Sequence, residues 1–245
     1  MTNSNSFQWP LSKKAAVSLT FDDARLSQID VGIPLLNQFG VKGTFFVSPA
    51  DMLKRLDGWR AAVQAGHEVG NHTVKHPCTC NFSWSIQNAL EDYTLDQMAA
   101  EIDEANSKIE KHLGIRPQSF AYPCGQTFVG RGVNTRSYVP LVAERFLVGR
   151  GFMSETSNDP IRCDLAQAMA SGLDNKPLAD LQREIERVKA SGCWLILAGH
   201  EMGKAESQSV AETVLTPLCR YLTESADLWV DTTANIGAYI AQKRR

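Results

Sequence analysis

The stretch Ala15-Ala-Val-Ser-Leu-Thr-Phe-Asp-Asp23 decides how the chain folds, because a strand of apolar and small residues runs directly into two adjacent carboxylates. Residues 29–39 follow with the apolar spacing of a helix, which Gly40 ends. A second buried strand, Gly43-Thr-Phe-Phe-Val-Ser48, comes next. A strand, a helix and a strand in this order predict a parallel β-α-β unit.

The same alternation continues toward the C-terminus. Further strands are predicted at 68–71, 119–122, 145–149, 193–198 and 227–230. Further helices are predicted at 59–64, 94–113, 178–190, 209–225 and 233–242. The helix at 94–113 has the clearest ends, since Thr94 and Gln97 have the spacing of a capping box and Gly114 follows its last residue. These repeats predict an α/β fold in which about seven parallel strands close into a barrel.

Length and composition favour a single soluble domain over residues 1–245. The chain has 245 residues, of which 43% are hydrophobic and 21% charged. Its net charge is −2 and its one basic run is Lys243-Arg244-Arg245, so we expect no nucleic-acid partner. The sequence shows neither a membrane span nor a signal peptide, so we expect no membrane partner and a cytoplasmic location, a removed leader being the alternative. Nothing in the sequence indicates an oligomeric state.

The cysteines are predicted to be reduced. The six are scattered along a long chain, and several adjoin apolar runs: Cys78, Cys80, Cys124, Cys163, Cys193 and Cys219. Scattered cysteines in a large domain differ from the dense frameworks of small secreted proteins. Partly buried thiols in a reducing compartment are therefore the expectation.

Ionisable and polar residues follow several of the predicted strands. Asp22 and Asp23 end the first strand, His72 and His76 follow the third, and His200 follows the apolar strand at 193–198. The segment Tyr122-Pro-Cys-Gly125 follows the strand at 119–122. Because the carboxyl ends of parallel strands face one side of a barrel, these residues are predicted to share one rim.

Their chemistry favours a metal-dependent hydrolase. His72 and His76 are four residues apart, so both rings can face one cation, and a carboxylate would complete the set of ligands. Two adjacent aspartates raise each other's pKa unless a cation is near, so one can bind the metal while the other acts as a base. His200 could protonate a leaving group. The alternatives are loop histidines and an aspartate that caps the next helix.

Four segments together resemble the polysaccharide deacetylases, the group with the nodulation-type deacetylase homology domain that is also called carbohydrate esterase family 4. They are Thr20-Phe-Asp-Asp23, His72-Thr-Val-Lys-His76-Pro77, Phe120-Ala-Tyr-Pro-Cys-Gly125 and Leu197-Ala-Gly-His200. Their order and spacing are more specific than any one segment, and the resemblance spans about residues 15 to 242.

The resemblance implies a distorted (β/α) barrel and a divalent metal, zinc being expected. Asp23, His72 and His76 match the metal ligands, Asp22 the catalytic base, and His200 the general acid. The remaining matches are to substrate binding, by Tyr122, Cys124 and Leu197, with an oxyanion donor at the Cys124 N–H and Leu197 bordering an acetyl pocket. The implied reaction removes an acetyl group from an N-acetylated or O-acetylated carbohydrate.

The sequence departs from the family pattern near the base and the acid. Ala24 replaces a usual glycine, Cys124 a usual tyrosine, and Ala121 an arginine that pairs with the base. The segment that supports the catalytic histidine has only Arg162 and Asp164 as weak matches.

These departures leave three alternatives open. The first is a hydrolase of a small non-sugar amide on the same scaffold. The second is a non-catalytic carbohydrate-binding relative. The third is a non-haem iron oxygenase, whose two histidines and one carboxylate form a similar set of ligands.

Overall fold

A sheet of eight parallel strands organises the computed structural model, which describes residues 7–244. The strands are β1 (Ala15–Asp22), β2 (Gly43–Val47), β3 (Glu68–Asn71), β4 (Ser119–Ala121), β7 (Val148–Arg150), β8 (Ser171–Gly172), β9 (Trp194–Gly199) and β12 (Leu228–Val230). Their order is β7-β4-β3-β2-β1-β9-β8, and β12 pairs with β1 beside this path. The predicted α/β fold with about seven parallel strands is confirmed.

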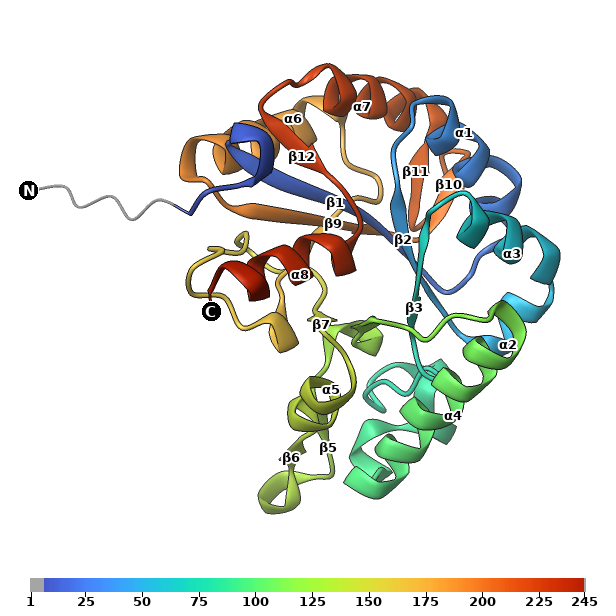
Figure 1. Ribbon diagram of the computed structural model, residues 1–245. Helices are drawn as coiled ribbons and strands as arrows, with labels where there is room; N and C mark the ends of the chain where they lie inside the picture. The colour runs from blue at the N-terminus through green and yellow to red at the C-terminus, as the bar shows by residue number, and fades with distance from the viewer. Residues whose placement is uncertain (1–6, 245) are drawn as a thin grey trace, which may run out of the picture.

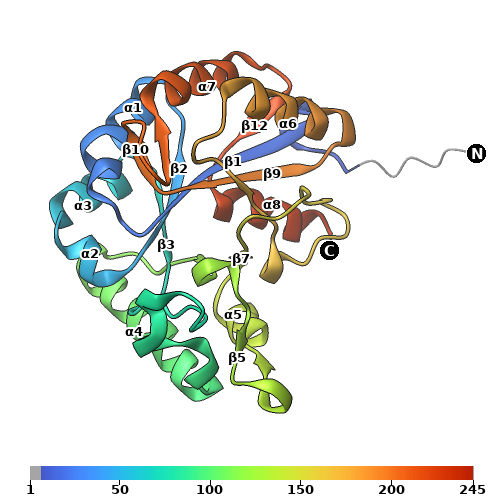
Figure 2. The ribbon, with the colours of Figure 1, turned by 180° about the vertical axis from the view of Figure 1, so that it is seen from behind.

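The sheet is strongly curled, as Figures 1 and 2 show from opposite sides. A parallel bridge joins Arg150 of β7 to Ala168, just before β8. Ala168 N donates to Gly149 O at 2.8 Å, and Gly151 N donates to Ala168 O at 2.8 Å. The barrel is distorted because this junction is short and β12 pairs only with the first part of β1.

Helices cover the outside of the curled sheet and one helix lies on its inner side (Figure 1). The helices are α1 (Ile33–Gln38), α2 (Pro49–Leu53), α3 (Leu56–Gln64), α4 (Leu95–Leu113), α5 (Val139–Arg145), α6 (Leu178–Ser191), α7 (Glu212–Glu224) and α8 (Thr233–Lys243). Two small ribbons complete the regular structure: β5 (Phe128–Val129) with β6 (Arg136–Ser137), and β10 (Glu201–Gly203) with β11 (Ser209–Ala211). Helices α6, α7, α1 and α3 form the outer arc, whereas α8 lies within the curve.

Alternation along the central strands divides the core into two layers. Val17 and Leu19 of β1 pack in the cluster that the outer helices cover. Ala16 of β1 and Trp194 of β9 lie in a second cluster, which Ile236 of α8 completes. Successive side chains of a strand point to opposite faces of the sheet. A strand in which nearly every residue is apolar therefore contributes side chains to both layers.

Some predicted element boundaries were wrong. Residues 145–149 were predicted as a strand, but α5 extends to Arg145 and β7 begins only at Val148. The predicted helix at 209–225 begins with β11, and the two-residue strand β8 was not predicted. By contrast, the Thr94 capping box is present: its side chain accepts from Gln97 N, and the Gln97 side chain accepts from Thr94 N.

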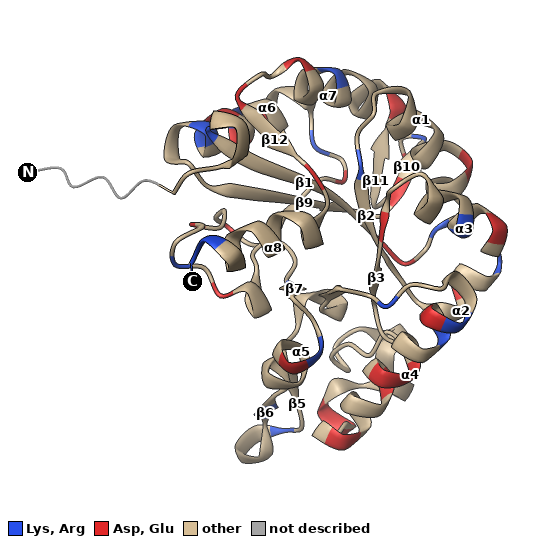
Figure 3. Ribbon diagram, in the orientation of Figure 1, with Lys and Arg blue, Asp and Glu red and all other residues tan. Residues whose placement is uncertain are grey.

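Charged residues lie mostly on the helices and loops, with acidic and basic side chains mixed (Figure 3). In the described part of the chain, no helix combines the length and apolarity that crossing a bilayer would require.

Glu68 is an exception to the exposed charges, since its carboxylate is buried at the start of β3. It accepts hydrogen bonds from Thr44 Oγ1 at 2.8 Å, from Ala234 N at 2.9 Å and from Ser119 Oγ. Glu68 therefore ties the first turn of α8 to three strands.

We expect Glu68→Ala to lower the free energy of unfolding by about 3 kcal/mol, because three buried donors lose their acceptor. Glu68→Gln should cost less, since its carbonyl oxygen can still accept. Burial raises the pKa of Glu68, so the folded state binds this proton more tightly than the unfolded state. The glutamine variant should therefore gain stability relative to wild type as the pH rises through that pKa. Urea titrations across pH test this, and equal losses in both variants would contradict it.

Candidate active site

A cavity of about 590 Å³ opens at the carboxyl ends of the strands, where the sequence predicts the site. All five predicted ionisable residues line it: Asp22, Asp23, His72, His76 and His200. They come from segments after β1, β3 and β9, which the parallel sheet brings to one rim. The structure thus brings together residues that are up to 178 positions apart, from Asp22 to His200.

Asp23, His72 and His76 are arranged as a metal-binding set. Asp23 Oδ1 lies 3.6 Å from His72 Nε2 and 3.7 Å from His76 Nε2. One ligand atom from each residue lies within 4.8 Å of the others. A carboxylate oxygen and two imidazole nitrogens at these separations can be ligands of one divalent ion, so the residues fit the expected metal.

The orientation of His72 and the pKa of His76 suit this arrangement. His72 Nδ1 donates to Ala121 O at 2.8 Å, which leaves the lone pair of Nε2 directed toward Asp23. Burial, followed by the nearby His72, lowers the pKa of His76 to about 4. Burial raises the pKa of Asp23, but the surrounding histidines and Arg25 outweigh it and hold that pKa below its usual value. Neutral imidazoles beside a carboxylate are the forms that bind metal.

Left-handed backbone conformations concentrate at these loops. Asp23 has φ 74°, Ala24 51°, Thr73 63° and His76 51°. An L-residue adopts this region at some cost, and such strain persists only where neighbouring groups fix it. The conformation of Ala24 gives a physical reason for the family's preference for glycine at that place.

Three residues that the sequence did not indicate hold these loops. Gln28 is fully buried and its Nε2 donates to the backbone oxygens of Asp22 at 2.6 Å and His200 at 2.9 Å. Glu101 of α4 accepts from Val74 N at 3.1 Å and from Lys75 N at 2.9 Å. The side chain of Asn71 accepts from Thr73 N at 2.7 Å. No sequence signal marks a residue that acts only through another segment's backbone.

Asp22 is held by an arginine that is not where the family pattern places one. Arg150 of β7 is fully buried, and its Nη2 donates to Asp22 Oδ1. Its Nη1 donates to Gly151 O at 2.9 Å, and its guanidinium lies 4.9 Å from the centre of the Phe46 ring. Arg150 is the Cα partner of Ala121 on the adjacent strand β4, so the small alanine stands beside the arginine.

His200 is supported by Asp174, which the sequence analysis missed. Asp174 Oδ2 accepts from His200 Nδ1 at 2.6 Å, and Asp174 Oδ1 accepts from His200 N at 3.0 Å. Burial lowers the pKa of His200, but the Asp174 hydrogen bond and the charges of Asp22, Asp174 and Asp23 outweigh it, so the net shift is upward. Phe152 packs edge-on against the imidazole, with ring centres 5.5 Å apart.

The two residues suggested for this support were wrong. Asp164 accepts from Ala166 N in a short turn, and Arg162 pairs with Asp159 on the surface. Asp174 follows β8, so it too lies at the carboxyl end of a parallel strand, as the other site residues do. A strand of two residues is too short to be recognised in the sequence, so its end could not be searched for site residues.

The three predicted substrate-binding residues have different environments. Tyr122 lines the cavity, but its hydroxyl donates to Ala166 O at 2.6 Å. Cys124 lines the cavity, has φ 54°, and its N–H makes no hydrogen bond to an acceptor within residues 7–244. Leu197 does not line the cavity, because its side chain faces the outer helices, whereas the next residue, Ala198, faces the barrel interior.

The expectation of reduced cysteines is wrong for one pair. Cys78 and Cys124 form a disulfide, while Cys80, Cys163, Cys193 and Cys219 are free. The chain positions of the pair gave no indication, since they are separated by 46 residues and meet only because β3 and β4 are neighbours.

Aromatic side chains form one wall of the cavity. Phe82 and Trp84 stack with ring centres 5.2 Å apart, and Trp84 lies 5.8 Å from His76. The Trp84 side chain is 60% exposed, which is unusual for a tryptophan without a role at the surface. Met153, also exposed, lines the same cavity.

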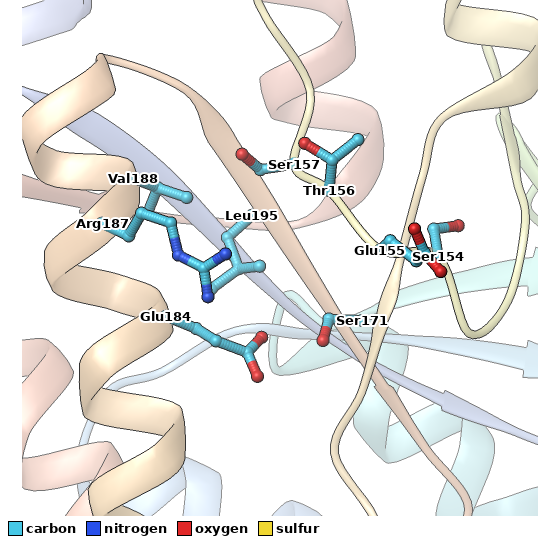
Figure 4. Close-up of a pocket in the computed structure, with 9 residues that line it drawn as sticks. All are labelled: Ser154, Glu155, Thr156, Ser157, Ser171, Glu184, Arg187, Val188 and Leu195. Atoms are coloured by element: carbon cyan, nitrogen blue, oxygen red, sulfur yellow. The ribbon is translucent and has the colours of Figure 1, made fainter.

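A second, smaller pocket of about 220 Å³ lies beside α6 (Figure 4). Glu184 and Arg187 of α6 face the hydroxyls of Ser157 and Ser171 across it. None of the predicted site residues lines this pocket, and it contains no histidine. The chemistry therefore belongs to the larger cavity.

A family model for polysaccharide deacetylase matches residues 11–136. The chain belongs to the polysaccharide deacetylase family. The matched region includes the first three of the four segments on which the resemblance was based, and the last, which contains His200, lies beyond it. The family is thus that expected from the sequence.

Among curated relatives, a gellan lyase from a Bacillus species is 27% identical over 256 residues. That match covers 96% of this chain but only 10% of the relative, so the chain spans about a tenth of that protein's length.

Two solved structures have the same fold. A putative polysaccharide deacetylase from Mycobacterium smegmatis superposes with a TM-score of 0.72 at 17% identity, covering 100% of this chain and 96% of that one. A PuuE allantoinase superposes with a TM-score of 0.70 at 15% identity, covering 97% and 94%. At these identities the likeness concerns the fold.

Replacing Asp174 by asparagine should lower the pKa of His200, because it removes the carboxylate whose hydrogen bond and charge favour the protonated ring. Titration of the His200 ring by NMR measures this directly, whatever the protein's activity. Unchanged amide chemical shifts in α4 provide the internal control that the fold is intact. An unchanged His200 titration would contradict the assignment.

Proposed function

We propose that the protein is a metal-dependent hydrolase that removes acetyl groups from an N-acetylated or O-acetylated carbohydrate. The observation that supports this most is the separation of roles in one cavity. A metal-binding set lies between a carboxylate paired with arginine and a histidine paired with aspartate. These are the groups that hydrolysis of an acetyl group requires: a Lewis acid, a base and an acid.

Asp23, His72 and His76 would hold the divalent ion, for which we propose zinc because its usual ligands are imidazole and carboxylate. Bound there, the ion supplies Lewis-acid polarisation of the acetyl carbonyl and lowers the pKa of water. The hydrogen bond from His72 Nδ1 to Ala121 O keeps the ring oriented for binding.

Asp22 takes the proton from the attacking water. Arg150 occupies Asp22 Oδ1, so Oδ2 is the oxygen left for this transfer. Cys124 lines the cavity and its N–H has no acceptor in the described chain, so this N–H would donate to the acetyl oxygen as that oxygen gains negative charge. His200, whose pKa Asp174 helps to raise, donates a proton to the departing nitrogen or oxygen.

Phe82 and Trp84 are suited to pack against the flat face of a sugar ring, since a stacked aromatic pair beside the metal-binding set offers a rigid apolar surface. The positions of Phe82, Trp84 and Met153 around the cavity would limit the length of the substrate. Short N-acetylated and O-acetylated sugars, a chitin oligomer and a small cyclic amide would distinguish a carbohydrate deacetylase from a hydrolase of small amides.

We expect acetate release from acetylated sugars when zinc is supplied, and Asp22→Asn should lower kcat by about a hundredfold or more because it removes the base. Zinc binding should persist in that variant, since Asp23, His72 and His76 remain. Calorimetry with zinc and an acetate assay measure the two properties. Unchanged turnover in Asp22→Asn would exclude the assigned base, and loss of zinc would show that Asp22 is itself a ligand.

Arg150→Ala should lower kcat by about a hundredfold, because Asp22 loses the group that orients it, while KM and zinc content change little. The register pairing of Ala121 with Arg150 allows a rescue. The double variant Arg150→Ala with Ala121→Arg should recover much of the lost turnover, since the new arginine starts from the neighbouring strand on the same face. Failure of the rescue in a folded double variant would contradict this positioning role.

A further inference from the structure

The disulfide between Cys78 and Cys124 joins two segments of the active site. Cys78 follows the proposed ligand His76 by two residues, and its sulfur lies 3.7 Å from His76 Nδ1. Cys124 lies in the turn after β4, and its N–H is the proposed oxyanion donor. One covalent bond therefore connects the loop that holds the metal to the turn that stabilises the acetyl oxygen.

The same bond anchors the aromatic wall. Ser85, next to Trp84, donates from its Oγ to Cys78 O at 2.9 Å and accepts from Cys78 N at 3.0 Å. Other contacts also join the two segments: Thr79 N donates to Gln126 Oε1 at 2.8 Å and Gly130 N donates to Leu90 O at 2.9 Å. Leu90 also packs in one apolar cluster with Tyr122 and Val129. Movement at Cys78 would therefore be transmitted to Trp84.

The Cys124 turn depends on such a tether. Cys124 has φ 54°, a left-handed conformation that a non-glycine residue keeps only when its surroundings hold it. The turn spans Pro123–Gly125, and its backbone bonds are local: Gly125 N donates to Tyr122 O at 2.8 Å and Gln126 N donates to Pro123 O at 3.0 Å. The disulfide is the covalent restraint at this position.

The two bridged cysteines differ in exposure. Cys124 lines the cavity and is partly exposed, whereas Cys78 is fully buried. We therefore expect a small thiol that enters the cavity to react at Cys124. Neither cysteine is a member of the three apolar clusters, although Cys78 is fully buried, so we expect the barrel to stay folded when the bridge is broken.

We propose that the Cys78–Cys124 disulfide is a redox-sensitive clamp, whose reduction frees the Cys124 turn from the His76 loop and lowers turnover while the barrel stays folded. The consequence for turnover rests on the proposed function; the loosening of the two segments does not.

The chemical step is exchange with a dithiol reductant. A reductant thiolate bonds to the Cys124 sulfur, the bond between the two protein sulfurs breaks, and the electron pair leaves on Cys78, which takes a proton. The second reductant thiol then displaces Cys124 from the mixed disulfide. The protein ends with two thiols and the reductant with one disulfide. Oxidation reverses the change.

The experiment compares oxidised protein with protein that has been reduced, desalted without oxygen and supplied with zinc. On reduction, amide hydrogen exchange should rise in residues 76–93 and 122–130 and stay unchanged in β1 and β9. The kcat for an acetylated sugar should fall about tenfold or more, because a misplaced oxyanion donor loses most of its effect. Reoxidation should restore both properties. Unchanged exchange in the two segments, or exchange that rises throughout the barrel, would overturn the proposal.

Two variants sharpen the test. Cys80→Ser removes a free cysteine two residues from the bridge and should respond to reduction as wild type does. The double variant Cys78→Ser with Cys124→Ser should show the reduced-state exchange and turnover whether or not reductant is present. Oxidised wild-type behaviour in that variant would overturn the clamp. If the oxidised protein hydrolyses no acetylated substrate, the proposed function fails, but the exchange measurements still decide whether the clamp exists.

Discussion

The ion pair between Asp22 and Arg150 is a constraint on which the rest of the site depends. It links β1 to β7 across the barrel interior, and these strands are separated by β2, β3 and β4 along the sheet. Taking both charges out of water is costly unless each finds a partner, and loss of one partner from such a pair typically costs about 3–5 kcal/mol. The pair therefore favours a sheet curled tightly enough to bring β7 to β1, which is the curvature that assembles the rim.

The ionisable side chains at the rim have defined orientations because neighbouring residues hold them by hydrogen bonds. Arg150 and Gln28 fix Asp22, Asp174 fixes His200, and the Ala121 carbonyl fixes His72. Each of these contacts joins segments far apart in the sequence. Groups preorganised in this way need little rearrangement during a reaction, which is the main means by which a protein stabilises developing charge.

The fold and the central residues could be predicted from the sequence, whereas their supports could not. Apolar strands ending in Asp22 and Asp23 or followed by His200 carry a local signal, because the carboxyl ends of parallel strands share one rim. Asp174 follows a strand of two residues, and Arg150 acts from a strand whose start was misplaced. Both supports arise from pairing across the sheet, which no local pattern encodes. The disulfide escaped prediction for the same reason, since only the adjacency of β3 and β4 brings Cys78 to Cys124.

The division between strands and loops also separates the two parts of the proposed function. The groups that would carry the chemistry lie at strand ends, where the sheet leaves them little freedom. The groups that would meet the substrate lie on loops: Trp84 in the segment after His76, and Met153 after β7. Loops vary more readily than the strands that support them. The reaction class therefore follows from the barrel, whereas substrate preference depends on the loops that the Cys78–Cys124 bridge holds in place.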